Sequence, residues 1–323
     1  MKAIVYHEYG SSDVLKLEEI DIPLVEDDQV LVKVHSVSIN PFDWHMMRGT
    51  PYLLRLQAGL LKPKNSGFGN DVAGVVESVG KNVTEFQPGD EVFGGGRGAL
   101  AEYVCAARDG IVHKLGALTF EQAASIPVAG LTALQGLRDK GQIQSGQSVL
   151  IHGASGGVGT FAVQIAKSYG AEVTGVCSTR NAEMVRSIGA DHVVDYTKED
   201  FTKSGQRYDL ILDAVGDHSL RELRRALEPT GILVMVGGGK MGRFGFGILV
   251  GMLETLVLSF FVSQKLIAMV AKRNGVDLVL LNELVIDGKI TPMIDRSYPL
   301  NKTVEAIQYL ETGRAQGKVV ITF

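Results

Sequence analysis

Short runs of alternating or β-branched apolar residues mark the first third of the chain. They lie at residues 3–6, 29–39, 72–79 and 91–93. Turn-forming tripeptides separate these runs, with Gly-Lys-Asn at residues 80–82 and Pro-Gly-Asp at residues 88–90. Strands joined by such turns pair antiparallel in barrel-like domains. The pattern therefore predicts a β-rich domain that extends to about residue 118.

From residue 119 onward the pattern changes to an alternation of strands and helices. A helical stretch at 120–139 precedes expected strands at 148–152, 172–177, 192–195, 208–213 and 231–236, with helices at 157–169, 181–188 and 219–227. Strands that alternate with helices at this spacing form right-handed βαβ units. We therefore expect a doubly wound parallel sheet in this part of the chain.

The end of the chain carries two further helical patterns, at 278–286 and 302–311, and a last strand at 318–323. We expect this tail to return to the β-rich domain. The sequence thus predicts an α/β protein of two domains, one discontinuous and β-rich (residues 1–124 and 273–323) and one doubly wound (residues 125–272). A length of 323 residues fits two domains of about 150 residues each.

Composition and charge narrow the class of protein. Hydrophobic residues make up 45% of the chain and charged residues 21%, and 39 residues are glycine, which is the profile of a glycine-rich α/β enzyme. The net charge is -4 and Lys and Arg form no cluster, so we expect no nucleic-acid partner. The two cysteines, Cys105 and Cys177, are too few for a disulfide framework or a cysteine-rich metal site, which favours a reducing cytoplasm.

The first ten residues and the most apolar segment bear on location and membrane association. The first ten residues alternate like a strand and lack the apolar run of a signal peptide, so a cytoplasmic location is expected. The most apolar segment, residues 244–262, is interrupted by Glu254 and three glycines, whereas a membrane span needs about 20 apolar residues. We expect no integral span. The segment is interpreted as a buried helix or a subunit interface, and we expect a homodimer; peripheral membrane contact stays open.

A glycine-rich loop carries the clearest chemical signal. Gly153, Gly156 and Gly159 recur every third residue between an apolar strand and a helix. Glycines in this context permit a tight turn and let backbone N–H groups approach a pyrophosphate at a helix N-terminus. Ser155 adds a hydroxyl. The loop predicts a Rossmann-type dinucleotide site, and the chain contains no G-x-x-x-x-G-K-[ST] sequence of a P-loop nucleotidase.

The end of the next strand predicts which dinucleotide is bound. NAD enzymes place an acidic residue there to hold the ribose 2′-hydroxyl. This chain has Ser178, Thr179 and Arg180 instead. A guanidinium suits a 2′-phosphate, which an acidic residue would repel, so we expect NADPH. The alternative is that Arg180 is a solvated residue of the first helical turn.

Several segments together resemble the medium-chain dehydrogenase/reductase superfamily. They read VSINPFDWHMMRG at 37–49, GNDVAGVVESVG at 69–80, FQPGDEVFG at 86–94, IPVAGLTAL at 126–134 and GADHVVDY at 189–196, besides the glycine-rich loop. The resemblance covers essentially the whole chain. It is strongest to the zinc-free quinone oxidoreductase-like branch, in the group of mitochondrial reticulon-interacting reductases and chloroplast envelope quinone oxidoreductase homologues. It implies a GroES-like catalytic domain beside the Rossmann domain.

The resemblance implies a set of cofactor contacts. The positions that hold the pyrophosphate in relatives correspond to Ser155, Gly156, Gly157 and Val158, and those that hold the adenosine 2′-phosphate correspond to Ser178, Arg180 and Tyr196. The strand ends that lie along the cofactor correspond to Val215, Gly216, Val236 and Gly237. The segment against the nicotinamide corresponds to Phe261 and Val262, and a C-terminal contact corresponds to Gly317 and Lys318. Gly216 and Gly237 are equally interpreted as glycines that the turns of the sheet require.

The resemblance also shows where a catalytic zinc would lie. The ligand positions of zinc-dependent relatives correspond to Asn40, Asn70 and Val128. Amide and isopropyl groups are not zinc ligands, so we expect no metal. His45 matches a proton-relay histidine of some zinc enzymes, but Phe42 replaces the hydroxyl residue of that relay. We interpret His45 as a residue of the groove wall or surface.

Without a metal, the expected hydride acceptors are already activated, namely quinones and α,β-unsaturated carbonyl compounds. Asn40 matches a family asparagine near the nicotinamide ribose, where its amide could hold a hydroxyl or the substrate carbonyl. Tyr52 is the candidate hydrogen-bond donor to a developing oxyanion. Tyr52 is equally interpreted as a packing residue, and solvent could supply the proton.

Two other functions stay open. One is an NADPH-binding interaction protein or membrane-peripheral protein with little turnover, which the apolar segment at 244–262 motivates. The other is an enoyl-thioester reductase, for which Lys62 and Lys64 are a sparse basic site.

Overall fold

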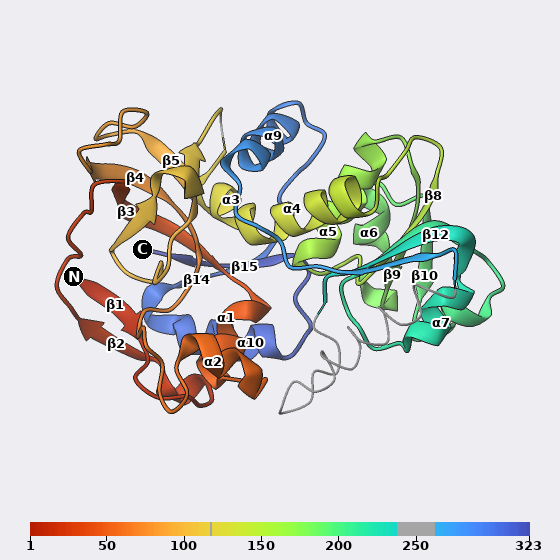
Figure 1. Ribbon diagram of the computed structural model, residues 1–323, viewed down its shortest axis with the longest axis horizontal. Helices are drawn as coiled ribbons and strands as arrows, with labels where there is room; N and C mark the ends of the chain where they lie inside the picture. Colours follow the sequence, from red (N-terminus) through yellow and green to blue (C-terminus); the bar gives the residue numbers. More distant parts are fainter. Residues whose placement is uncertain (117, 238–261) are drawn as a thin grey trace. The chain divides into compact units, whose positions relative to one another are not determined.

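The computed structural model describes residues 1–116, 118–237 and 262–323 (Figure 1). The chain forms two compact units. Unit 1 comprises Met1–Leu131, Arg273–Ile286 and Pro292–Phe323, and unit 2 comprises Thr132–Lys272 and Asp287–Thr291. Each unit has its own sheet and its own hydrophobic core.

The limits of these units differ from the expected limits in two places. The chain passes from unit 1 to unit 2 within helix α4 (Pro127–Leu134), rather than after residue 124. In addition, Asp287–Thr291 belongs to unit 2. There the backbone N–H of Thr291 donates to Gln164 Oε1 at 2.8 Å, and Gln164 Nε2 donates to the Thr291 carbonyl oxygen at 3.1 Å. Such side chain to backbone contacts leave no periodic signal in the sequence.

Unit 1 contains a seven-stranded sheet whose strands pair antiparallel, apart from the parallel pair β14 and β15. The order is β14-β15-β3-β4-β5-β7, and β6 pairs with β3. The strands are β3 (Gln29–Ile39), β4 (Asp71–Val79), β5 (Glu91–Gly95), β6 (Tyr103–Ala107), β7 (Ile111–His113), β14 (Ile294–Pro299) and β15 (Lys318–Thr322). β1 (Lys2–Val5) and β2 (Lys16–Glu19) form a separate two-stranded sheet. The long strand β3 alternates buried and exposed side chains near its middle, as expected for a sheet with one face on the core.

The helices of unit 1 flank this sheet and are mostly short. They are α1 (Pro41–Arg48), α2 (Arg55–Ala58), α3 (Phe120–Ser125), α9 (Gly275–Ile286) and α10 (Thr303–Glu311). Strand β15 pairs antiparallel with β3, with Val319 opposite Ile39. The C-terminal tail therefore completes the sheet of the N-terminal residues.

Unit 2 contains a six-stranded, fully parallel sheet in the order β10-β9-β8-β11-β12-β13. Numbered along the chain, this is the 3-2-1-4-5-6 order of a Rossmann fold, and the predicted doubly wound sheet is confirmed. The strands are β8 (Ser148–His152), β9 (Glu172–Cys177), β10 (His192–Asp195), β11 (Tyr208–Asp213), β12 (Leu227–Met235) and β13 (Lys265–Ala268). The central strands are buried almost throughout, because helices cover both faces of such a sheet.

The helices that follow the strands are α5 (Gly157–Ser168), α6 (Ala182–Ser187) and α7 (Leu220–Arg225). α6 is shorter than predicted, since residues 179–181 form a separate 3-10 turn. β12 begins earlier than predicted, and the short edge strand β13 was not predicted at all.

The strand order of unit 2 reverses between β8 and β11, which lie side by side. His152 ends β8 and stands in register with Asp213, which ends β11. In open parallel sheets, ligands bind at the carboxyl ends of the strands where the order reverses. The loops after His152 and Asp213 are thus the place to look for a site.

Within the residues that the structure describes, no helix is both long and apolar enough to cross a membrane. The apolar segment at 244–262 lies outside the described residues, apart from Val262.

Candidate functional site

The glycine-rich loop lies between β8 and α5. The structural requirement for glycine differs among its three glycine positions. Gly153 has a left-handed backbone (φ 85°), and a Cβ at Gly159 would overlap the carbonyl oxygen of Gly153. The turn and the close approach of α5 therefore require these two glycines. A Cβ at Gly156 would meet only the Gly153 oxygen, at 3.5 Å. Packing does not explain Gly156, whereas a ligand that needs the space above the turn does.

Gly156 is also the N-cap of α5, a helix of 12 residues. The first N–H groups of a helix have no partner within it and carry the positive end of the helix dipole. An open glycine cap followed by free N–H groups is the geometry that binds phosphate groups. The predicted loop residues Ser155, Gly157 and Val158 are all partly exposed here.

A polar side chain that the sequence analysis missed joins this loop to the end of β9. Asn181 is 5% exposed, and its Nδ2 donates to Ser155 Oγ at 2.8 Å. Its signal in the sequence is weak, because it is one short polar residue directly after Ser178, Thr179 and Arg180. It fixes the hydroxyl of Ser155 relative to the segment expected to select the cofactor.

An acidic residue, Asp195 at the end of β10, contacts the segment that follows β9. Hydrogen bonds from the hydroxyls of Thr179 and Thr197 hold the pKa of this carboxyl well below its usual range. Lys198 Nζ lies 3.3 Å from Oδ2, the oxygen that also accepts from Thr179. The charge of Asp195 is therefore engaged locally. Arg180 and Tyr196 are exposed, as a contact to a 2′-phosphate requires.

The predicted residues after β11 and β12 lie at neighbouring strand ends. The N–H groups of Val215 and Gly216 donate to Asp213 Oδ1 at 3.0 and 2.9 Å, and those of Val236 and Gly237 donate to the Asp213 carbonyl oxygen at 2.9 and 3.1 Å. Gly216 has a positive φ, and a Cβ at Gly237 would overlap the backbone of Ala214. Turn geometry thus accounts for both glycines. Phe261 lies outside the described residues, and Val262 is partly buried just before β13.

Unit 1 contains a buried polar network at the end of β3. Asn40 Nδ2 and Ser38 Oγ donate to Asp71 Oδ2 at 2.9 and 3.0 Å, and Lys318 Nζ donates to Asn40 Oδ1 and lies 3.6 Å from Asp71 Oδ2. Asp71 Oδ1 accepts the backbone N–H of Val128 at 3.2 Å. Asn40 and Lys318 are each 3% exposed. Burial lowers the pKa of Lys318, while the Asp71 carboxylate opposes that shift.

This network fixes the orientation of the Asn40 amide. An ammonium only donates and an ionised carboxylate only accepts, so Oδ1 must face Lys318 and Nδ2 must face Asp71. The second hydrogen of Nδ2 is directed at the Ser38 carbonyl oxygen, 3.4 Å away. Asn40 therefore has an acceptor lone pair to offer and no well-placed donor. It suits a ribose hydroxyl better than a substrate carbonyl.

A second carboxylate, Asp43, continues the network. Its Oδ2 accepts the backbone N–H of Asn40 at 2.7 Å, and its Oδ1 accepts from Asn70 Nδ2 at 2.6 Å. Asn70 Oδ1 in turn accepts from Arg273 Nη2 at 2.9 Å. Burial raises the pKa of Asp43 to about 6, and Asp71 adds to the rise.

The candidate donor Tyr52 lies elsewhere in unit 1, in a 3-10 turn (Tyr52–Leu54). The Arg55 guanidinium lies 4.6 Å from the centre of its ring and 4.3 Å from the ring of Tyr9. Tyr52 thus belongs to a cation-π stack, whereas Asn40 belongs to the buried network. Gly317, next to Lys318, packs against the Met293 backbone.

Comparison with known proteins identifies the family. An alcohol dehydrogenase GroES-like domain model matches residues 26–116, and a zinc-binding dehydrogenase model matches residues 188–321. The chain is 36% identical to the mitochondrial NAD(P)H oxidoreductase RTN4IP1 of Mus musculus, over 99% of this chain and 89% of the relative. The chain belongs to the medium-chain dehydrogenase/reductase superfamily, in its zinc-free quinone oxidoreductase-like branch. The expected resemblance and the GroES-like plus Rossmann fold are confirmed.

Two further relatives of this branch are similar over nearly the whole chain. The chloroplastic NADPH-dependent alkenal/one oxidoreductase of Arabidopsis thaliana is 34% identical, over 99% of this chain and 79% of the relative. The solved quinone oxidoreductase from Coxiella burnetii is 34% identical, with a TM-score of 0.86 over 100% of this chain and 99% of that one.

The zinc that other members of the superfamily carry does not fit this chain. At the corresponding positions, the amides of Asn40 and Asn70 are engaged in hydrogen bonds, and Val128 contributes only its backbone N–H. The buried ammonium of Lys318 supplies the positive charge beside the carboxylates. The three positions that bind zinc in relatives therefore offer no zinc ligand in this chain.

The proton-relay residues of zinc enzymes are altered as well. His45 Nδ1 lies 2.9 Å from the Thr50 carbonyl oxygen, and its ring stacks on Trp44 at 3.7 Å. Burial lowers the pKa of His45. The residue is half-buried and held by neighbours on its own segment, in keeping with a wall position. Phe42 is 49% exposed and offers no hydroxyl.

Proposed function

We propose that the chain is a zinc-independent oxidoreductase that transfers a hydride from NADPH to quinones or to α,β-unsaturated carbonyl compounds. One observation carries the proposal: the superfamily's zinc position holds a closed network around Lys318, Asn40 and Asp71. Since no Lewis acid fits there, the acceptor must already be activated. Relatives over nearly the whole chain are named as an alkenal/one oxidoreductase and a quinone oxidoreductase, which supports the same substrate class.

Unit 2 is the proposed NADPH-binding domain. NADPH supplies the hydride when it is bound. The N–H groups after Gly156 would hold the pyrophosphate, and Ser178, Arg180 and Tyr196 would hold the 2′-phosphate. The open space at Gly156 and the exposed guanidinium of Arg180 support this assignment. The relative from Arabidopsis thaliana is named NADPH-dependent, which agrees with it.

Unit 1 is the proposed catalytic domain. Negative charge develops on the acceptor oxygen after hydride addition, and hydrogen-bond donors must stabilise it. Because the Asn40 donors are committed to Asp71 and Ser38, we assign that task to Tyr52 or solvent and assign Asn40 to a ribose hydroxyl. Conjugation spreads the charge and reduces the need for strong donors. Quinones, enones and alkenals fit this limit better than saturated ketones or alcohols.

We further propose that the protein works in the cytoplasm as a homodimer. The low cysteine content fits a reducing compartment, and the apolar segment at 244–262 is a candidate for the interface. Light scattering coupled to size-exclusion chromatography tests the dimer, and cell fractionation tests the location.

The experiment that tests the function follows NADPH oxidation with a panel of quinones, 2-alkenals, enones, enoyl thioesters, saturated ketones and ethanol (the alcohol with NADP+). We expect turnover with quinones, alkenals or enones and none with saturated ketones or ethanol. A preference for ethanol or a simple ketone would contradict the activated-acceptor mechanism. Tight NADPH binding without turnover of any compound would show a binding protein instead of an enzyme.

A further inference from the structure

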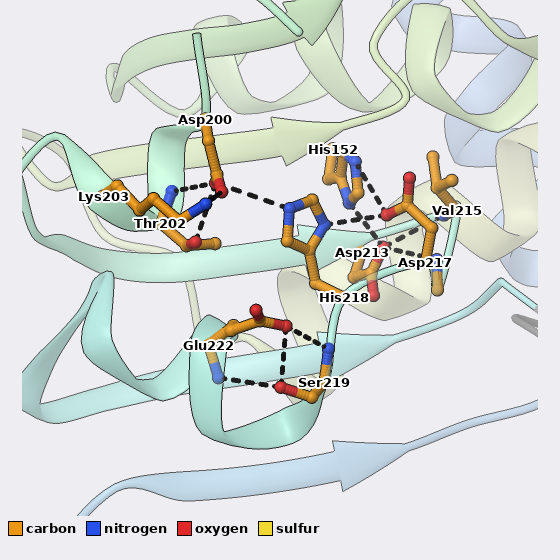
Figure 2. Close-up of polar contacts among 11 residues, drawn as sticks. His152, Asp200, Thr202, Lys203, Asp213, Val215, Asp217, His218, Ser219 and Glu222 are labelled. Atoms are coloured by element: carbon orange, nitrogen blue, oxygen red, sulfur yellow. Dashed lines mark hydrogen bonds and ion pairs between the residues drawn. The ribbon is translucent and has the colours of Figure 1, made fainter.

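A cluster of side chains that could hold a metal ion lies at the carboxyl ends of β8 and β11 in unit 2, directly after the cofactor-assigned Val215 and Gly216. His152, Asp217 and His218 each offer one ligand atom, and these three atoms all lie within 4.8 Å of one another. His152 Nε2 lies 3.5 Å and His218 Nδ1 lies 2.8 Å from Asp217 Oδ1. Figure 2 shows both imidazoles facing the Asp217 carboxylate from the same side.

The hydrogen-bond partner of His152 fixes its tautomer. Its Nδ1 lies 2.9 Å from Oδ1 of Asp213, a carboxylate that is 1% exposed. The same oxygen accepts the backbone N–H groups of Val215 and Gly216, at 3.0 and 2.9 Å. An ionised carboxylate only accepts, so Nδ1 must carry the proton. The lone pair of neutral His152 therefore lies on Nε2, which faces Asp217.

His218 is held from two sides. Its Nδ1 donates a hydrogen bond to Asp217 Oδ1 at 2.8 Å, and its Nε2 lies 3.5 Å from Asp200 Oδ1, on the side away from Asp217. A metal ion at this point would take the place of the Nδ1 proton, and the proton would then lie on Nε2, which faces Asp200. Two imidazole nitrogens and a carboxylate oxygen would then converge on one ion.

The surroundings hold these groups in place. Phe201 is buried and contacts both imidazoles, with its ring centre 5.2 Å from that of His152 and 4.9 Å from that of His218. On the other side of His218, Ser219 caps α7 in a reciprocal pair with Glu222, which fixes the chain directly after the histidine (Figure 2). The ligand-bearing loop is thus anchored at both ends, at Asp213 and at Ser219.

We propose that His152, Asp217 and His218 form a binding site for a divalent transition-metal ion, with Zn²⁺ as its best match. Two imidazoles and one carboxylate are a common set of protein ligands for zinc, with a fourth position left for water. Ligand atoms about 2.0–2.2 Å from a tetrahedral ion lie roughly 3.3–3.6 Å apart, so small side-chain movements suffice to close this cluster on an ion. Asp213 behind His152 supplies the outer carboxylate that typically orients a metal-binding imidazole.

The site is accessible and differs from the catalytic zinc of the superfamily. The side chain of Asp217 is 53% exposed and that of His218 is 21% exposed, so an ion can enter from solvent. The catalytic ligand positions, at Asn40, Asn70 and Val128, all belong to unit 1. The new site adjoins Val215 and Gly216, which are assigned to the cofactor, so zinc binding is measured without NADPH and is scored separately from hydride transfer.

The test measures competition for zinc between the metal-free full-length protein and a chromogenic chelator. We expect one Zn²⁺ per chain for the wild type. Asp217→Asn and His218→Gln should each weaken zinc binding by more than roughly 10-fold, because each removes a direct ligand. His192→Gln is the matched control, since His192 pairs with Glu172 on the surface at 2.8 Å without a third ligand. It should bind zinc like the wild type.

Two further measurements keep the result clear. Melting temperatures of the variants, measured without metal, show whether each protein is folded, and the visible spectrum of bound Co²⁺ reports the coordination geometry. Mg²⁺ should not displace zinc, because it prefers oxygen ligands in octahedral geometry. No zinc binding by the wild type, or equal binding by the wild type, Asp217→Asn and His218→Gln, would overturn the proposal.

Discussion

The glycine-rich loop of unit 2 and the buried network of unit 1 differ in the exposure of their polar groups. At the loop, Gly156 leaves space unfilled and Arg180 and Tyr196 are exposed, so binding groups face outward. In the network, Asn40, Asp71 and Lys318 are buried and satisfy one another. The loop is built to receive a ligand, whereas the network balances its own buried charges.

The difference shows how a superfamily fold works after losing its metal. A buried carboxylate pair needs a cation or a proton, because isolated charges are costly in a low-dielectric interior. In this chain the Lys318 ammonium and the raised pKa of Asp43 meet that need. The cofactor loop keeps its usual geometry, since the dinucleotide does not depend on the metal.

The largest effect is expected where the closed network is broken. Lys318→Met removes the only ammonium that contacts Asp71 among the described residues, and it leaves the carboxylate and the Asn40 oxygen without that partner. We expect the free energy of unfolding to fall by about 3–5 kcal/mol, measured by denaturant titration. The control Lys289→Met, at an exposed pair with Asp287, should change it by less than about 1 kcal/mol. Equal small losses would mean that the network is not closed.

The next prediction concerns pH. The pKa of Asp43 is raised from 3.8 to about 6, so protonated Asp43 stabilises the fold. That contribution is fully present below about pH 4 and is lost as the pH rises through 6. Relative to Asp43→Asn, wild-type stability should fall by roughly 2–3 kcal/mol between pH 4 and pH 7. A constant difference between the two proteins over this range would show that Asp43 titrates normally.

At the outward-facing site, Arg180→Ala should affect one cofactor and spare the other. Losing a charge-assisted contact should weaken NADPH binding by roughly 1.5–3 kcal/mol and leave NADH binding nearly unchanged. Dissociation constants from cofactor fluorescence measure both. The same loss for NADH and NADPH would remove Arg180 from the 2′-phosphate site.

Two glycines of the same loop should separate binding from packing. A Cβ at Gly159 overlaps the Gly153 oxygen, so Gly159→Ala should reduce the free energy of unfolding by about 1–3 kcal/mol. Gly156→Ser should leave it within about 0.5 kcal/mol, since serine is a good N-cap, yet weaken NADPH binding more than roughly tenfold. If Gly156→Ser bound NADPH normally, the open space would not be the cofactor cradle.

Much of the fold could be predicted because its signals are local. Glycine spacing, alternating apolar residues and turn sequences indicated the two sheets, and Gly153 to Gly159 lay in the expected place between β8 and α5. Short elements such as β13 were missed, since a four-residue edge strand carries little periodicity.

The partners of the site residues could not be predicted, because they are far apart in sequence. Asn40 and Lys318 are 278 residues apart and meet only when β15 pairs with β3. The sequence indicated that zinc was absent at Asn40 without indicating that an ammonium replaces it. Likewise, His152 and Asp213 are 61 residues apart and meet because parallel strands align their ends.

The central claim is that activated acceptors are reduced without a catalytic metal. The most direct test measures kcat for NADPH oxidation with the best enone or quinone, before and after dialysis against a strong chelator, with the zinc content determined in both samples. The account predicts the same kcat in both samples, including those with far less than one zinc per chain. Loss of turnover on zinc removal, restored by adding zinc, would contradict it.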